Sequence, residues 1–218
     1  MYLYDIVKLF TMNDKSQIKV IYKKKTVYCG RVDYLQFNHD GMLDPICNKA
    51  VSLWYVEHNP VNPKNATRTV DNKYIIIPNI MTVVVTDPVE EVEPIRTFGD
   101  IPDNNIKLRD IIGLAVWVIP SFIELMGQED ENPLALEDII RTSELLSDMH
   151  NMNLKGFKPK RTLSLPSDIY DRGIIWLDLS NYYVDPEKDI MDASGFYSEP
   201  KPRLSIQLSG SLMDDENK

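Results

Sequence analysis

The chain has 218 residues, of which 43% are hydrophobic and 26% are charged, a composition that is usual for a globular protein and excludes a wholly disordered chain. The net charge of −9 is unevenly divided: residues 1–86 hold 11 Lys and Arg against 7 Asp and Glu (+4), whereas residues 87–218 hold 13 against 26 (−13). The second part therefore lacks the excess of cations that bulk binding to nucleic-acid phosphates requires.

Residues 1–87 are expected to form a small α+β unit with an antiparallel sheet and short helices. Apolar side chains recur at helical spacing in residues 3–10, which predicts an amphipathic helix. Strands are predicted at residues 18–22, 26–32, 51–57, 74–77 and 80–86. Lys23, Lys24 and Lys25 would join the first two strands as the tip of a hairpin. Alternation along the third strand would place Trp54 on the face opposite Val51.

A linker is expected at residues 88–105, which contain three prolines and a cluster of acids. The longest apolar stretch follows at residues 106–127 and predicts a buried helix, with a kink or break at Pro120. Its apolar run, at residues 111–119, is too short for a membrane span, which needs about 20 residues, and Pro120 and Glu124 interrupt the stretch. Pro133, at a first helical position, indicates a second helix that runs to about Met152. We expect the two helices to form a hairpin.

The C-terminal part is predicted to return to β-structure and to complete a second unit at residues 106–209. Residues 173–179 are mostly apolar, which is typical of a buried strand. Residues 204–208 alternate between apolar and polar types, which is typical of a half-exposed strand. The acidic tail at residues 210–218 is expected to be disordered. The predicted fold class is α+β, with an N-terminal small antiparallel sheet and short helices, a central helical hairpin and C-terminal strands.

Four side chains are of the types that bind zinc, namely Cys29, His39, Cys47 and His58. Their separations of 10, 8 and 11 residues lack the closely paired ligands of a zinc finger or ribbon. We therefore expect neither a metal ion nor another cofactor. The sequence contains no nucleophile elbow, cysteine-protease signature or phosphate-binding glycine loop, so it indicates no catalytic residues.

Four aspartates leave an enzymatic alternative open. Paired carboxylates can bind a divalent cation or transfer protons, and the four follow one another within a short region: Asp168, Asp171, Asp178 and Asp185. Asp178 lies in an otherwise apolar strand, where burial would raise its pKa, unless it faces outward from an edge strand. The alternative is a metal-dependent or carboxylate-based hydrolase that uses Asp171 or Asp178.

Two charged clusters are candidates for binding a partner. Lys23, Lys24 and Lys25 could contact phosphates, although a charged hairpin tip that prevents edge-to-edge aggregation explains the same residues without a ligand and is the favoured interpretation. Glu129, Asp130 and Glu131 could present an acidic surface to a basic protein, or could form a solvated loop. We expect a protein partner, with any nucleic-acid contact limited to a weak one at the three lysines.

The N-terminal part resembles the start of small uncharacterised proteins that are encoded by phages and mobile elements of low-GC Gram-positive bacteria. Two segments carry the resemblance, LYDIVKLF and QIKVIYKKKTVYCGRVDYL, as a short helix, a hairpin and another short helix. The resemblance covers at most residues 1–87. It implies an accessory protein that acts on host machinery by binding, as anti-defence inhibitors do, and it implies no activity or site residues.

These observations together predict a non-enzymatic protein that binds a protein partner through its acidic second half, by covering a basic surface. The chain has two cysteines, and its N-terminus lacks a signal-peptide pattern. We therefore expect a cytoplasmic protein without membrane contact. Besides the hydrolase, a structural phage or assembly component is an alternative, and it would form a defined homo-oligomer.

Overall fold

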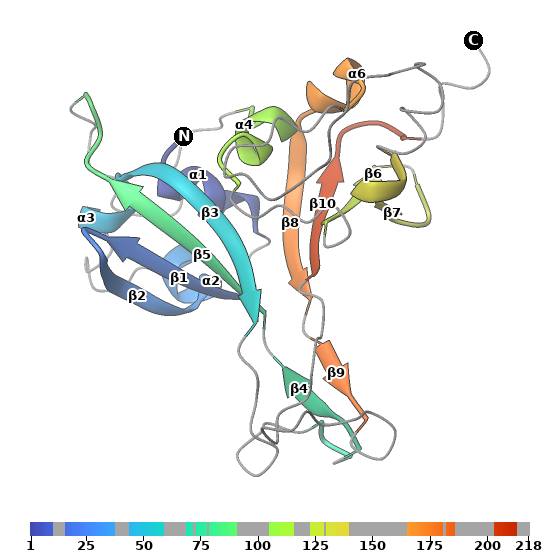
Figure 1. The fold of residues 1–218 in the computed structure, drawn as a ribbon, viewed down its shortest axis with the longest axis horizontal. Coiled ribbons are helices and arrows are strands. Elements are labelled where there is room, and N and C mark those ends of the chain that lie inside the picture. The colour runs from blue at the N-terminus through green and yellow to red at the C-terminus, as the bar shows by residue number, and fades with distance from the viewer. Residues whose placement is uncertain are drawn as a thin grey trace, which may run out of the picture.

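The computed structural model describes residues 1–10, 16–37, 44–58, 69–71, 73–77, 79–90, 105–115, 123–128, 130–139, 165–180, 182–185 and 203–212. These residues form two four-stranded sheets, a two-stranded sheet and short helices (Figure 1). The predicted α+β class is thus confirmed. No helix in these ranges is long and apolar enough to cross a membrane.

The N-terminal sheet has the strand order β2-β1-β5-β3. Its strands are β1 (Gln17–Tyr22), β2 (Lys25–Arg31), β3 (Ala50–His58) and β5 (Asn79–Thr86). Apart from their end residues, these are the strands predicted from the sequence. β1 and β2 pair as the predicted hairpin.

One pairing in this sheet differs from the predicted antiparallel arrangement. β1 and β5 run parallel, with Val20 beside Val83, whereas the β1–β2 and β5–β3 pairs are antiparallel. β5 is buried along most of its length and lies between two neighbours. An apolar strand of this kind suits the centre of a sheet. The antiparallel prediction is wrong at β1–β5, because the pattern that identifies a strand does not identify its neighbours.

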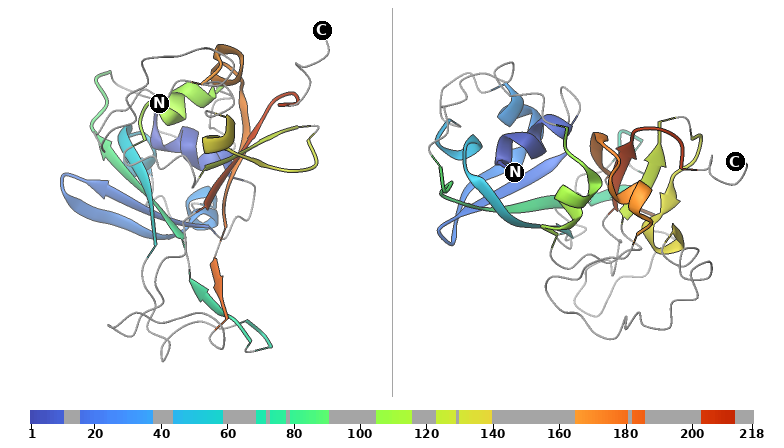
Figure 2. Two further views of the ribbon diagram at one scale, coloured as in Figure 1. Left: turned by 45° about the vertical axis from the view of Figure 1, so that its right-hand side comes forward. Right: turned by 90° about the horizontal axis from the view of Figure 1, so that it is seen from above.

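Short helices pack against the N-terminal sheet. They are α1 (Leu3–Leu9), α2 (Val32–Gln36) and α3 (Asp44–Cys47). α1 is the helix predicted at residues 3–10, and it is buried on nearly all sides. The backbone N–H of Tyr2 donates to the Asp5 carboxylate at 2.7 Å and closes the N-terminal end of α1. Figure 2 (right) shows the blue helices on one side of the blue and green strands.

The C-terminal sheet has the strand order β7-β6-β10-β8. Its strands are β6 (Ile123–Gly127), β7 (Leu134–Ala135), β8 (Ile174–Ser180) and β10 (Arg203–Leu208). β6 and β10 run parallel, and the other two pairs are antiparallel. The strands predicted at residues 173–179 and 204–208 are confirmed as β8 and β10.

The predicted helix at residues 106–127 is wrong at its C-terminal end. Its helical part among the described residues is α4 (Leu108–Ile112), and the stretch ends as β6. Ile123 and Leu125 of β6 are buried and alternate with half-buried residues, so this segment has the period of a strand. Pro120 lies outside the described residues.

The second predicted helix is also wrong at its start, where Leu134 and Ala135 form β7 and pair with β6. Residues 136–139 are helical, as predicted. The remainder, to Met152, lies outside the described residues. The helical hairpin is therefore replaced, where the chain is described, by two paired strands and short helical segments.

Residues 105–115 connect the two large sheets. Lys107 forms a β-bridge with Gly173 beside β8, and Ala115 forms another with Trp54 of β3. The indole N–H of Trp54 also donates to the Ile111 carbonyl at 2.7 Å. Both sheets contribute to one hydrophobic core cluster, and Figure 1 shows α4 between them. Within the described ranges, the two units expected from the sequence thus share a core.

A small ribbon lies apart from the two large sheets (Figure 1). It pairs β4 (Ile75–Ile77), which is the strand predicted at residues 74–77, with β9 (Tyr182–Val184) in antiparallel orientation. α6 (Ser167–Tyr170) precedes β8. Of the linker predicted at residues 88–105, residues 91–104 lie outside the described ranges.

Candidate functional site

The outer edge of β2 differs from the outer edges of β3 and β8. The outer edge of β3 is covered, because Trp54 N–H donates to the Leu114 carbonyl at 3.0 Å and Val51 N–H donates to the Met1 carbonyl at 3.0 Å. The outer side of β8 forms a bridge from Leu177 to Phe10. Within the part of the chain that the structure describes, no strand or bridge pairs with the outer side of β2.

The turn before β2 presents the three lysines of the predicted hairpin tip. Tyr22 pairs with Lys25, so Lys23 and Lys24 form a two-residue loop, with φ angles of 48° and 63°. Positive φ at both positions is typical of a type I′ turn, which matches the twist of the two strands. All three lysines are exposed. The hairpin tip is thus confirmed, and it places positive charge at the start of β2.

Positive charge also lies at the end of β2. The Arg31 guanidinium donates to the Asp33 carboxylate at 3.0 Å and lies over the Tyr34 ring at 5.2 Å from its centroid. Tyr34 is 63% exposed. Between the two charged ends, Val27 and Cys29 are exposed. An edge with open backbone groups, apolar and small side chains and cationic ends can accept a further strand.

Tyr28 stabilises the inner part of this edge. Its hydroxyl donates to the Arg31 carbonyl at 2.6 Å, and its ring covers Gly30, where a Cβ atom would lie 2.9 Å from the Tyr28 hydroxyl oxygen. Burial raises the pKa of Tyr28 to about 12, so this hydroxyl stays protonated and remains a donor at neutral pH. These contacts help to hold β2 in its extended shape on the side away from β1.

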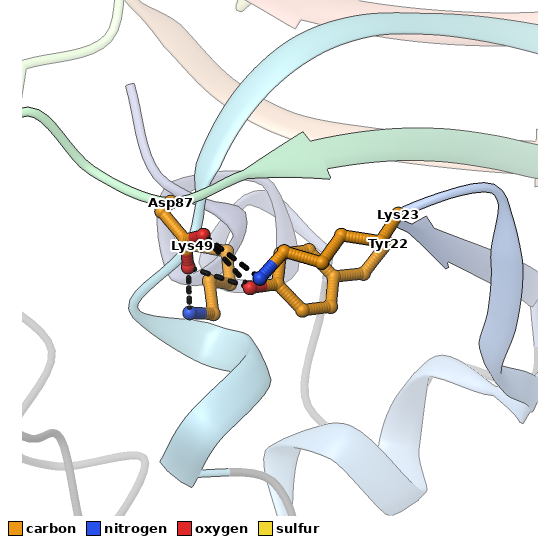
Figure 3. Close-up of polar contacts among 4 residues, drawn as sticks. All are labelled: Tyr22, Lys23, Lys49 and Asp87. Carbon is orange, nitrogen blue, oxygen red and sulfur yellow. Dashed lines mark hydrogen bonds and ion pairs between the residues drawn. The ribbon is translucent and has the colours of Figure 1, made fainter.

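Lys23 also takes part in a polar cluster beside the turn, which Figure 3 shows. Four side chains form this Asp87 cluster: Tyr22, Lys23, Lys49 and Asp87. The Tyr22 hydroxyl donates to the two Asp87 carboxylate oxygens at 2.7 and 2.8 Å, the Lys49 ammonium also donates to Asp87, and the Lys23 ammonium lies 3.4 Å from it. Hydrogen bonds from Lys49 and then Tyr22 hold the pKa of Asp87 well below its usual range.

The sequence alone did not indicate the Asp87 cluster, although it did single out Lys23. Tyr22, Lys49 and Asp87 are separated by 27 and 38 residues along the chain. Tyr22 and Asp87 meet because the parallel pairing of β1 and β5 brings the ends of both strands together. Lys49 joins them because the antiparallel pairing of β3 and β5 places Ala50 opposite Thr86. Only knowledge of both pairings would have revealed the cluster.

No match is found. Neither the scan against protein-family models nor the searches of curated proteins and solved structures return one. Function is therefore inferred from the residues of the site and their geometry.

The acidic candidates have different structural roles. The Asp130 carboxylate accepts hydrogen bonds from Gly127 N–H and Leu212 N–H, both at 2.9 Å, and from the Ser211 hydroxyl. Burial raises the pKa of Asp130, but these bonds lower it by more, so its pKa lies below the usual value. Glu131 is exposed, and Glu129 lies outside the described residues. Partner binding by the acidic cluster stays a prediction.

The first residues of the tail that was expected to be disordered are held by these bonds. Ser211 and Leu212 lie in the predicted tail at residues 210–218, yet both bind Asp130, and Leu212 packs against the core. The Gly210 carbonyl accepts a further bond from Gln128 N–H at 2.8 Å. Residues 210–212 are therefore anchored, and residues 213–218 lie outside the described ranges.

Two of the four aspartates of the hydrolase alternative, Asp168 and Asp171, lie beside basic side chains. Asp171 pairs with Arg109 and lies 3.9 Å from Lys107, and Asp168 lies 3.7 Å from Arg172. Asp178, on the edge strand β8, is half-buried and pairs with Ser205 of β10. These contacts are typical of surface ion pairs and of an edge-strand position.

The zinc candidates are only partly described. Cys29 is exposed on β2 and Cys47 is buried in α3. His39 and the side chain of His58 lie outside the described residues. In the ranges that were searched, no three His, Cys, Asp or Glu side chains are grouped so that they could hold a metal ion.

Proposed function

We propose that this protein is a non-enzymatic binding protein whose β2 edge accepts an extended, acidic segment of a partner protein as an additional strand. The observation that carries the proposal is the long unpaired edge of β2 with cations at both of its ends. Main-chain hydrogen bonds would supply affinity, and carboxylates opposite the lysines and Arg31 would supply specificity. An accessory role against host machinery, of the kind that the N-terminal resemblance implies, requires such a contact.

Charge favours an acidic partner over a second copy of this chain. If two β2 strands paired antiparallel about Tyr28, Lys25 of each would lie opposite Arg31 of the other. Like charges directly opposite each other destabilise a strand pair. The exposed Lys23 and Lys24 would add to this repulsion. An acidic segment replaces the repulsion by attraction at both ends of the edge.

The test uses a fluorescent peptide of the length of β2 in which Glu and Val alternate, with binding measured by anisotropy. Two further peptides carry N-methyl groups on every second residue. One of them, the first phase, is methylated on its Glu residues, and the other, the second phase, is methylated on its Val residues. In a strand only alternate N–H groups face a given neighbour, so one phase blocks pairing and the other leaves it intact. We expect the blocked phase to bind about tenfold or more weakly, which corresponds to roughly 1.4 kcal/mol.

A Lys/Val peptide is the charge control, and it should not bind. Equal affinity of the two N-methylated phases would show that the peptide is held by charge alone, which contradicts strand addition. Equal binding of the Lys/Val peptide would contradict the acidic preference.

A further inference from the structure

We propose that Tyr22, Lys23 and Lys49 form a binding site for a phosphate group, and that Asp87 occupies this site as an internal substitute. The site lies at the carboxyl ends of the parallel strands β1 and β5, where ligand sites of sheets with parallel strands commonly lie. This inference does not depend on strand addition at β2, because none of the three donors lies on that strand.

The backbones of two donor residues, Tyr22 and Lys49, are positioned without the help of Asp87. Tyr22 is the last residue of β1 and pairs with Lys25 on one side and Val85 on the other. Lys49 is fixed through its backbone, because its N–H donates to the Ile46 carbonyl at 3.0 Å and its carbonyl accepts from Leu3 N–H at 2.9 Å. The site would therefore persist if Asp87 moved away.

The aromatic ring of Tyr22 supports both ammonium groups. The Lys23 and Lys49 nitrogens each lie 4.8 Å from the centroid of this ring, and the Tyr22 hydroxyl donates toward the same carboxylate. Two cations and one hydroxyl donor thus face one point in space. Such a set of charged donors is suited to an oxyanion.

The charges in the cluster do not balance. Lys23 and Lys49 contribute two positive charges, and the Asp87 carboxylate contributes one negative charge. A phosphate monoester, with a charge near −2 at neutral pH, would balance both ammonium groups and would offer an additional acceptor oxygen. The donor set therefore fits a phosphate dianion better than it fits the carboxylate.

Asp87 is placed so that a ligand can replace it. Its side chain is 54% exposed, and it follows the last residue of β5, so its departure breaks no ladder hydrogen bond of the sheet. Salt weakens an exposed ion pair of this kind, which leaves it open to competition. Phosphate binding would release the Asp87 side chain.

The test is a titration with inorganic phosphate, followed through the backbone amide NMR signals of Tyr22 and Lys49 at constant ionic strength set by chloride. If Asp87 fills the site nine-tenths of the time or more, Asp87→Ala should bind phosphate about tenfold or more tightly than the wild type. Lys49→Met in the Asp87→Ala background should abolish this response. Lys73→Met is the matched control, because Lys73 lies 5.0 Å over the Tyr74 ring outside the cluster, and it should change nothing.

Equal phosphate affinity of the wild type and Asp87→Ala would overturn the proposal, as would a response that persists in the Lys49→Met variant. Asp87→Ser serves as a second variant that must show the same gain, so that unfolding of one variant does not decide the outcome. Tighter binding of a phosphoserine peptide than of inorganic phosphate would identify a phosphorylated segment as the source of the group, and equal affinities would identify a free phosphate. Failure of this site would leave the N-methyl peptide result at β2 unaffected.

Discussion

Lys23 and Lys24 both have positive φ angles in the turn between β1 and β2. Residues with a side chain avoid this region of backbone conformation at a cost of roughly 1–2 kcal/mol, whereas glycine and asparagine are usual in type I′ turns. The two lysines thus hold a position for which the turn alone would favour other residues. If the edge binds an acidic segment, the positive charge of the two lysines at the start of β2 explains why lysine, and not glycine or asparagine, occupies this turn.

The turn predicts a stabilising substitution. Lys24→Gly should increase the free energy of unfolding by about 1 kcal/mol, because glycine adopts a φ of 63° without steric cost. Lys25→Gly is the control. Lys25 lies in β2 without a positive φ, so this variant should be destabilised by about 0.5–1 kcal/mol. Urea unfolding measures both, and a Lys24→Gly variant less stable than the wild type would contradict the assigned turn.

Two variants of the acidic cluster test whether the hydrogen bonds of Asp130 stabilise the fold. Asp130→Asn should lower the free energy of unfolding by about 1–3 kcal/mol, because bonds to Gly127, Ser211 and Leu212 are weakened or lost. Glu131→Gln, at the exposed neighbour, should change it by less than about 0.5 kcal/mol.

The pH dependence of the Asp130 variant has a definite sign. The folded-state pKa of Asp130 lies below its unfolded value of about 3.9, so its contribution is complete above that pH and is lost as the pH falls through the folded pKa. The stability difference between wild type and Asp130→Asn should therefore shrink in acid. A difference that is constant down to the acid transition would show that the carboxylate charge has no part in it.

At the scale of elements, the segment at residues 105–115 joins the two large sheets through Trp54. Trp54 is 2% exposed, and its indole N–H donates to the Ile111 carbonyl next to the β-bridge between Trp54 and Ala115. A buried indole that bonds to a carbonyl of another element fixes the distance between β3 and α4.

Trp54→Phe should lower the free energy of unfolding by about 0.5–1.5 kcal/mol, because most of the ring is retained while the Ile111 carbonyl loses the indole N–H and keeps the Leu114 N–H as a donor. Trp54→Ala should cost about 3–5 kcal/mol through the cavity that it leaves. Thermal or urea unfolding followed by circular dichroism measures both. Two separate transitions in Trp54→Phe would show that the sheets unfold independently, and a change within about 0.5 kcal/mol would contradict the role of the indole bond.

Strands with a clear alternation could be predicted from the sequence, and β10 is the best case. The alternation in β3 was recognised, but the register shifts between Val51 and Leu53, so Val51 and Trp54 are both buried instead of lying on opposite faces. β6 was assigned to a helix because a long apolar run does not distinguish a buried helix from a buried strand. The Asp87 cluster depends on a pairing between distant strands, which local patterns do not encode.

At the scale of the whole molecule, the division of charge separates two kinds of surface. The N-terminal part, residues 1–86 with a net charge of +4, contains the β2 edge and the three donor residues of the Asp87 cluster. Asp87 itself is the first residue of the acidic part. The sequence pointed instead to the acidic second part as the contact surface. In that part, Asp130 accepts hydrogen bonds from within the protein. We therefore propose that the contact surface is instead at Lys23, Lys24 and Lys25, which were also candidates from the sequence.

Amide hydrogen exchange of β2 tests strand addition most directly, with and without the alternating Glu/Val peptide. Pairing of the peptide with the outer edge predicts that alternate amides of residues 28–31 exchange more slowly when it is bound, because in this regularly paired part of β2 only every second N–H faces the new strand. Amides of β10, which lies inside the C-terminal sheet, should be unchanged. Exchange in β2 that is the same with and without bound peptide would contradict strand addition at this edge.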